Sequence, residues 1–172
     1  MTWLRDAVDA SLTAVNLDSD ADLERILRVR SLGSYGVAVF KQESGAWWVL
    51  GSFVCGGPRN RMQDPFIELK PLISPGTSDI IVHSGGSQGT GVGAAQFTVY
   101  RVFKGQLYQV LDIVEYAYNW TTDEKTQIHF RDRSIIVRRT RKARNQETTS
   151  SEVYRWDAGR FMFVSTGVHC VH

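Results

Sequence analysis

The chain has 172 residues and a formal net charge of +2, with 42% hydrophobic and 22% charged residues. This length and composition are ordinary for one globular domain over residues 1–172 that buries a real core. No apolar run is long enough to cross a bilayer as a helix, and so small a net charge gives no global argument for nucleic acid as a partner.

Residues 1–15 are predicted to form a short amphipathic helix. Leu4, Val8, Leu12 and Val15 recur at helical spacing, which would place them on one face of a helix. The stretch does not have the basic start and apolar core of a signal peptide. An extracytoplasmic location is the expectation only if a leader precedes this sequence, so the compartment stays open.

An acidic run follows the predicted helix. Asp18, Asp20 and Asp22 alternate with other residues, and their carboxylates could wrap several oxygens around a hard cation such as Ca²⁺. The alternative is a solvated acidic turn, because Ala21 and Ile26 stand where a calcium loop usually has glycine and a further ligand. Calcium is therefore the one candidate cofactor.

Beyond this run, a template recurs three times: Val, an aromatic residue, a basic residue, three variable residues, Gly, one variable residue and two large apolar residues. The copies begin at Val39, Val99 and Val153, and their glycines are Gly45, Gly105 and Gly159. Each copy alternates as a strand does. We predict three β-hairpins in which the glycine supplies a positive φ at the turn.

Further strand-like runs precede the hairpins, at residues 23–29, 79–83 and 134–138, and residues 66–73 and 127–130 could supply a fourth strand. Together these segments define three approximate units, residues 16–60, 66–118 and 125–168. The predicted fold is all-β, with repeated antiparallel β-meander units after a short N-terminal helix. The units would form a partial propeller-like array, a sandwich or a bent sheet, since a closed propeller has four or more blades.

Short motifs at the start of the units resemble a known family. Residues 15–24 (Val-Asn-Leu-Asp-Ser-Asp-Ala-Asp-Leu-Glu) lead into a predicted strand, residues 75–82 are similar to a degenerate second copy, and residues 131–134 occupy the matching place in the third unit. These motifs resemble FG-GAP or VCBS-type β repeats, in which an acidic loop enters each blade. The resemblance implies an adhesive, calcium-supported module, although Ser19 and Ala21 replace the usual glycines.

Residues 84–94 are rich in glycine and match part of a dinucleotide-binding fingerprint. That site needs a helix after the glycines, whereas the strand-like second hairpin follows them here. We therefore predict no nucleotide and interpret the segment as a connection between antiparallel strands. Alternatively, it is a recognition loop that presents Ser87, Gln88, Gly89 and Gly91 to a partner.

The third unit contains a dense basic run, between what we predict to be its first two strands. Its members are Arg138, Arg139, Arg141, Lys142 and Arg144. They could bind an acidic protein face or an anionic glycan, or they could be a solvated hairpin tip whose charges discourage strand pairing. Because this run and the Gly-rich segment join equivalent strands, we expect both at one edge of the array.

Several aromatic residues could join such a surface. Trp47 and Trp48 are adjacent in a predicted strand, so one should face the core and the other solvent. The exposed one, or Trp120 with Tyr116 or Tyr118, could stack on sugars or anchor a partner. Core packing is the alternative for all of them.

Catalytic candidates are few. The four histidines do not have the spacing of a zinc site, and Asp112 and Glu115 could pair as the acid and base of a glycan-acting enzyme. Cys55 and Cys170 are the only cysteines, and they are predicted either to form one disulfide or to remain two thiols. We expect a non-enzymatic binding or interaction module, as an exported inhibitor or an adhesive-type module, with the enzyme as the alternative.

Overall fold

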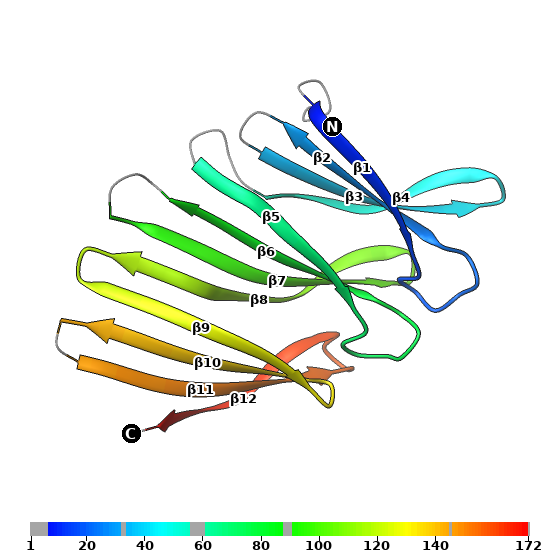
Figure 1. Cartoon of the computed structure of the whole chain (residues 1–172). Helices are drawn as coiled ribbons and strands as arrows, with labels where there is room; N and C mark the ends of the chain where they lie inside the picture. Colours follow the sequence, from blue (N-terminus) through cyan, green and yellow to red (C-terminus); the bar gives the residue numbers. More distant parts are fainter. Residues whose placement is uncertain (1–6, 32–33, 56–60, 88–90, 145, 172) are drawn as a thin grey trace.

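The computed structural model describes residues 7–31, 34–55, 61–87, 91–144 and 146–171, and the side chains of residues 61–64, 86–87 and 170–171 lie outside this description. Within these ranges the chain is all β (Figure 1). The strands are β1 (Ala7–Val15), β2 (Glu24–Ser31), β3 (Ser34–Glu43), β4 (Ala46–Cys55), β5 (Arg61–Lys70), β6 (Asp79–Ser87), β7 (Gly93–Phe103), β8 (Gln106–Asn119), β9 (Thr122–Arg131), β10 (Ser134–Ala143), β11 (Gln146–Asp157) and β12 (Met162–Val171). The described part contains no helix with the length and apolar character needed to span a bilayer.

The strands form three meanders of four strands each. Each strand pairs antiparallel with its neighbour in sequence, within a four-stranded sheet of β1–β4 and an eight-stranded sheet of β5–β12. Inside the larger sheet, β8 and β9 pair only at their hairpin tip, where residues 116–119 face residues 122–125. We therefore describe a first unit (β1–β4), a second unit (β5–β8) and a third unit (β9–β12), each ending in a hairpin of the repeated template.

The N-terminal helix predicted over residues 1–15 is wrong for its described part. Residues 7–15 form β1, which pairs antiparallel with β2; residues 1–6 lie outside the described ranges. The spacing was ambiguous because Val8 and Leu12 are four positions apart, which fits the period of a strand as well as that of a helix. The pairing with β2 decided between them.

The three template hairpins have two kinds of turn. Gly45 and Gly105 have φ values of +81° and +72°, as expected for two-residue hairpin loops. The prediction for Gly159 is wrong, because the positive φ in the last hairpin belongs to Phe161, at +54°. There the turn is longer, and Asp157 Oδ1 accepts a hydrogen bond from the backbone N–H of Gly159 at 2.9 Å, which organises it locally.

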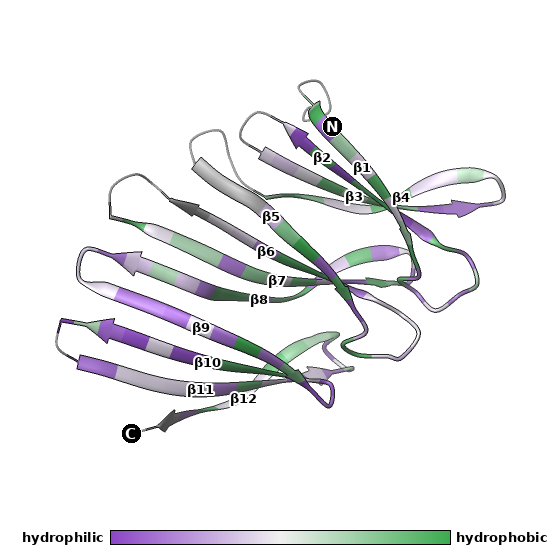
Figure 2. Cartoon of the chain, viewed as in Figure 1, coloured by the Kyte–Doolittle hydropathy of each residue, from purple (hydrophilic) through white to green (hydrophobic). Residues whose placement is uncertain are grey.

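The core consists of two layers, one on each side of the second unit. The layer between the first and second units includes Ile26, Val39, Ile80 and Val82. The layer between the second and third units includes Ile81, Val99, Ile135 and Val137. Because neighbouring strand residues point to opposite faces, β6 contributes to both layers. Figure 2 shows the apolar residues gathered in the parts of β6–β10 away from the β6–β7, β8–β9 and β10–β11 tips.

Asp79, the first residue of β6, ties its strand to the rest of the second unit. It is fully buried, accepts a hydrogen bond from the backbone N–H of Leu72 at 3.0 Å, and lies 2.7 Å from Arg101 Nη1. Arg101 Nη2 also donates to Ser74 Oγ at 3.2 Å. Burial raises the pKa of Asp79, and the charge of Arg101 opposes that rise. One carboxylate thus holds β6, β7 and the loop of residues 71–78 together.

We expect Asp79→Asn to destabilise the protein by about 3 kcal/mol, because it leaves the guanidinium of Arg101 nearly buried and without its counter-charge. The free energy of unfolding in urea measures this loss. The control is Asp132→Asn, whose side chain is 89% exposed, and which should change stability by less than about 0.5 kcal/mol. Equal losses in the two variants would contradict the anchoring role of Asp79.

Candidate partner-binding edge

The Gly-rich segment and the basic run lie at the same end of the strands. The first contains the β6–β7 connection and the second approaches the β10–β11 connection, with the β8–β9 turn between them (Figure 1). These connections join the second and third strands of their units rather than the first and second, because each unit has one more strand at its start. We call this end of the sheet, with its three hairpin tips, the tip edge.

A shallow pocket of about 400 Å³ lies at the tip edge. Three aromatic residues, Tyr116, Tyr118 and Trp120, and two bases, Lys142 and Arg144, line it. The indole of Trp120 is 76% exposed, and the rings of Tyr116 and Tyr118 lie with their centroids 5.3 Å apart. The pocket therefore combines ring faces with positive charge.

The β8–β9 turn holds Trp120 out toward solvent. Asn119 Oδ1 accepts hydrogen bonds from the backbone N–H groups of Thr121 and Thr122, each at 3.0 Å. Such a side-chain-to-backbone arrangement fixes a tight turn without help from the core. Trp120 is the next residue along the chain, so its exposed position follows from the local structure.

The glycines of the Gly-rich segment make room for these rings. A Cβ atom at Gly91 would stand 2.7 Å from the indole of Trp120, and one at Gly93 would overlap the ring of Tyr118. Gly93 and Tyr118 are directly opposite in the β7–β8 ladder, so the ring covers the glycine across the strands. After the glycines comes β7, a strand as predicted, and not the helix of a dinucleotide site.

The charges of the pocket are partly balanced. Lys142 Nζ lies 3.0 Å from Glu147 Oε2, and this pair raises the pKa of Lys142 above its usual value. Both side chains are more than half exposed, so an incoming anion could replace Glu147 at little cost. Asp123 also lines the pocket, whereas Arg144 has no carboxylate within ion-pair distance among the described residues.

The four basic residues on β10 divide between the two faces of the strand. Arg138 and Lys142 share one face, and Arg139 and Arg141 share the other. Arg139 donates to Glu152 Oε2 at 2.6 Å and is only 24% exposed, so it belongs to an internal ion pair. Arg138 and Arg141 are exposed. Sequence analysis placed these residues in one connection between strands. In the structure the first four belong to β10, which ends at Ala143, and only Arg144 lies beyond it.

Other predicted site residues lie elsewhere or outside the description. Ser87 ends β6, and its side chain, with Gln88 and Gly89, is outside the described residues. Trp47 and Trp48 are 51% and 58% exposed, so the expectation that one of them faces the core is wrong. They follow the β3–β4 turn, at the end of the strands away from the tip edge (Figure 1).

The predicted disulfide stays a prediction. Cys55 is a buried free thiol, and burial raises its pKa to about 11. The side chain of Cys170 lies outside the described residues. Cys55 packs in the layer between the first and second units, whereas Cys170 is on β12 of the third unit, where its backbone lies opposite Ser150.

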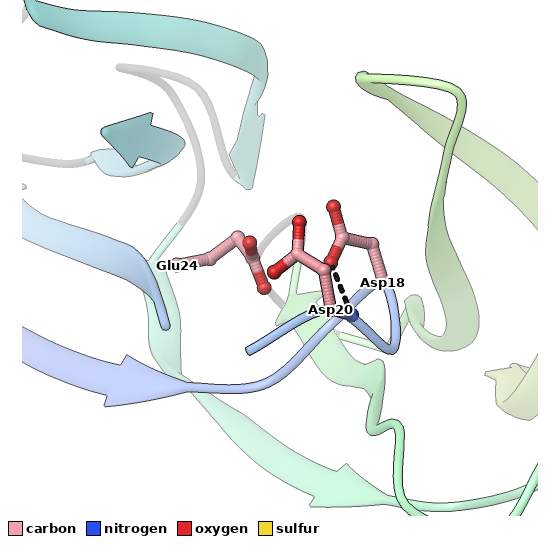
Figure 3. A group of neighbouring side chains, drawn as sticks. All are labelled: Asp18, Asp20 and Glu24. Atoms are coloured by element: carbon pink, nitrogen blue, oxygen red, sulfur yellow. Dashed lines mark hydrogen bonds between the residues drawn. The ribbon is translucent and has the colours of Figure 1, made fainter. Parts of the chain in front are cut away.

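The acidic run forms a group of carboxylates around an internal cation. Oxygens of Asp18, Asp20 and Glu24 lie within 4.8 Å of one another, and Figure 3 shows the three side chains pointing together. The ammonium of Lys41 pairs with Asp18 and Asp20 and lies 3.8 Å from Glu24 Oε1. Although burial alone lowers the pKa of Lys41, these hydrogen bonds raise it above its usual value.

This group differs from the predicted calcium ligands in two ways. Glu24, at the start of β2, takes the place expected for Asp22, which is not part of the group. Its carboxylate is fully buried and accepts a hydrogen bond from the backbone N–H of Leu17 at 2.7 Å. Sequence analysis named neither Glu24 nor Lys41 as part of this group. Lys41 is distant along the chain from the acids, and only the β2–β3 pairing brings it close to them.

Comparison of the chain with protein-family models, with curated proteins and with solved structures found no match. The function is therefore argued from the side chains of the site itself.

We expect Gly93→Ala to destabilise the protein by about 1–3 kcal/mol, because the added methyl group overlaps the ring of Tyr118. Urea unfolding measures the loss. In a Tyr118→Ala background the same substitution should cost less than about 0.5 kcal/mol, since the overlapping ring is gone. A cost that is equal in both backgrounds would show that the ring is not what the glycine accommodates.

We expect millimolar Ca²⁺ to leave the melting temperature unchanged, because the ammonium of Lys41 already supplies the cation and a ligand must favour the native state to raise its stability. In Lys41→Met, the carboxylates would lack a counter-charge and Ca²⁺ should raise the melting temperature by several degrees. Differential scanning calorimetry with Ca²⁺ or with chelator makes both measurements. A calcium-dependent rise in the wild-type protein would contradict the first expectation.

Proposed function

We propose that the chain is a non-enzymatic binding module whose tip edge holds an anionic glycan. The observation that favours this ligand is the combination, in one shallow pocket, of Tyr116, Tyr118 and Trp120 with Lys142 and Arg144. Exposed ring faces suit the apolar faces of sugar rings, and the two bases suit carboxylate or sulfate groups.

The shape of the pocket supports a chain-like ligand rather than an enclosed small molecule. It lies across two neighbouring hairpin tips and is built from residues of β8, the β8–β9 turn, β9, β10 and the β10–β11 connection. Arg138 is exposed on the same face of β10 as Lys142, so a longer anionic polymer would meet further positive charge beyond the pocket.

The residues suggested for catalysis each have another partner. Asp112 Oδ1 accepts a hydrogen bond from Thr98 Oγ1 at 2.9 Å. Glu115 lies 3.0 Å from Nδ1 of His83. These contacts give each carboxylate a structural role in the second unit, which supports binding rather than glycan hydrolysis as the function to test first.

The test is isothermal titration of the protein with a sulfated hexasaccharide, a galacturonic acid oligomer and neutral maltohexaose. We expect an anionic glycan to bind and maltohexaose to bind weakly or not at all. Trp120→Ala should weaken binding about tenfold, as expected for a central aromatic anchor. The double variant Lys142→Ser with Arg144→Ser should weaken it and reduce its dependence on salt.

The matched control is Arg160→Ser, which removes an exposed base that is not part of the pocket. It should leave the affinity unchanged. Failure of both anionic glycans to bind would contradict the proposal, as would equal losses in Arg160→Ser and in the double variant. Binding of a single-stranded oligonucleotide without any glycan binding would instead indicate nucleic acid, because aromatic rings with basic residues also suit stacked bases.

A further inference from the structure

Corresponding positions on the second and third units form a row of polar and charged residues across neighbouring strands. In the second unit the row is Lys70, Asp79 and Arg101, with the acid between two bases. In the third unit the row is Arg131, Ser134 and Arg155, and Ser134 is directly opposite both arginines. The third unit thus keeps the bases and has a serine where the second has its buried acid.

The loop that supports the acid is absent together with it. In the first two units, long loops of residues 16–23 and 71–78 precede the second strand, and a backbone N–H seven positions before the acid donates to Glu24 or Asp79. In the third unit only Asp132 and Arg133 separate β9 from β10, both with positive φ.

A pocket of about 570 Å³ lies at this place in the third unit. Arg131, Arg133 and Arg155 line it together with the hydroxyl-bearing Ser134 and an apolar wall that includes Trp156. Asp132 is the one acid in the lining, and its Oδ2 is 3.4 Å from Arg131 Nε. Within the described chain, Arg155 has no carboxylate at ion-pair distance.

The pocket is open because nothing in the described chain packs on this face. Ile26 of the first unit and Ile81 of the second occupy the equivalent position on β2 and β6, and each is buried against the next unit. Ile136 has that position on β10 and lines the pocket instead. The adjacent strand β9 presents exposed Lys125 and His129 on the same side.

We propose that this pocket, which we call the end pocket, binds a ligand with two or more carboxylates, in the place where the second unit has its own Asp79. Two guanidinium groups flank the position of Ser134, and guanidinium groups match carboxylates through paired N–H donors. The volume is in the range of small-molecule sites. A free polycarboxylic acid and the acidic side chains of a peptide share this chemistry. The end pocket is separate from the tip edge and does not depend on the glycan proposal.

The test titrates the protein at low ionic strength with citrate, with an end-blocked tetraglutamate peptide and with inorganic phosphate. We expect citrate, the peptide or both to bind more tightly than phosphate. Arg155→Gln should weaken that binding at least about tenfold. Binding of citrate alone identifies a free acid as the source, and binding of the peptide alone identifies an acidic protein segment.

A second variant tests the same idea in the opposite direction. Ser134→Asp supplies the missing carboxylate from the chain itself, so it should abolish citrate or peptide binding while leaving the melting temperature equal to or above that of the wild-type protein. The matched control is Arg141→Gln, an exposed arginine on the other face of β10, which should not change the affinity. Trp120→Ala, which affects the tip edge, should not change it either.

Three results would overturn the proposal. The first is that neither citrate nor the peptide binds, and the second is that phosphate binds at least as tightly as both. The third is that Arg155→Gln and Ser134→Asp, both folded by circular dichroism, bind with the same affinity as the wild-type protein. The Ser134→Asp variant keeps the test decisive even if Arg155→Gln is poorly expressed.

Discussion

The alternation of side chains along β6 is the constraint on which the rest of the structure depends. Ile80 and Val82 fill the layer against the first unit, and Ile81 fills the layer against the third. A strand that is buried on both faces needs apolar residues at every position, and β6 meets that need only until His83. Beyond His83 the buried side chains give way to glycine and polar residues. The tip edge is therefore not needed for core packing and is available to bind a ligand.

The buried carboxylates extend this constraint to the loops. Glu24 and Asp79 each start the strand whose next residues enter a core layer. Because a buried charge is costly without partners, each acid requires a base from the third strand and a backbone N–H from the preceding loop. The third unit has neither the acid nor that loop, and its Arg155 is consequently exposed rather than buried.

The all-β class and the template hairpins could be predicted from sequence, because strand alternation and Gly turns are local properties. The helix over residues 1–15 was wrong because spacing by four is compatible with both periods, and only the partner strand β2 settles it. The glycines at Gly91 and Gly93 could not be explained from sequence, since the rings that they accommodate come from β8 and its turn. The same holds for Lys41, whose place among the acids depends on strand pairing.

Both proposed sites lie where the units stop matching one another, and this follows from how the repeat is built. Positions that all three units share, such as Ile26, Ile81 and Ile136, are suited to packing against a neighbouring unit. Only the last of them has no neighbour in the described chain, so its surroundings are available to a ligand. At the tip edge, likewise, the pocket is built only where the second and third units meet, from residues of β8, β9 and β10 and their connections. The repeat therefore supplies the scaffold, and its irregular positions supply the chemistry.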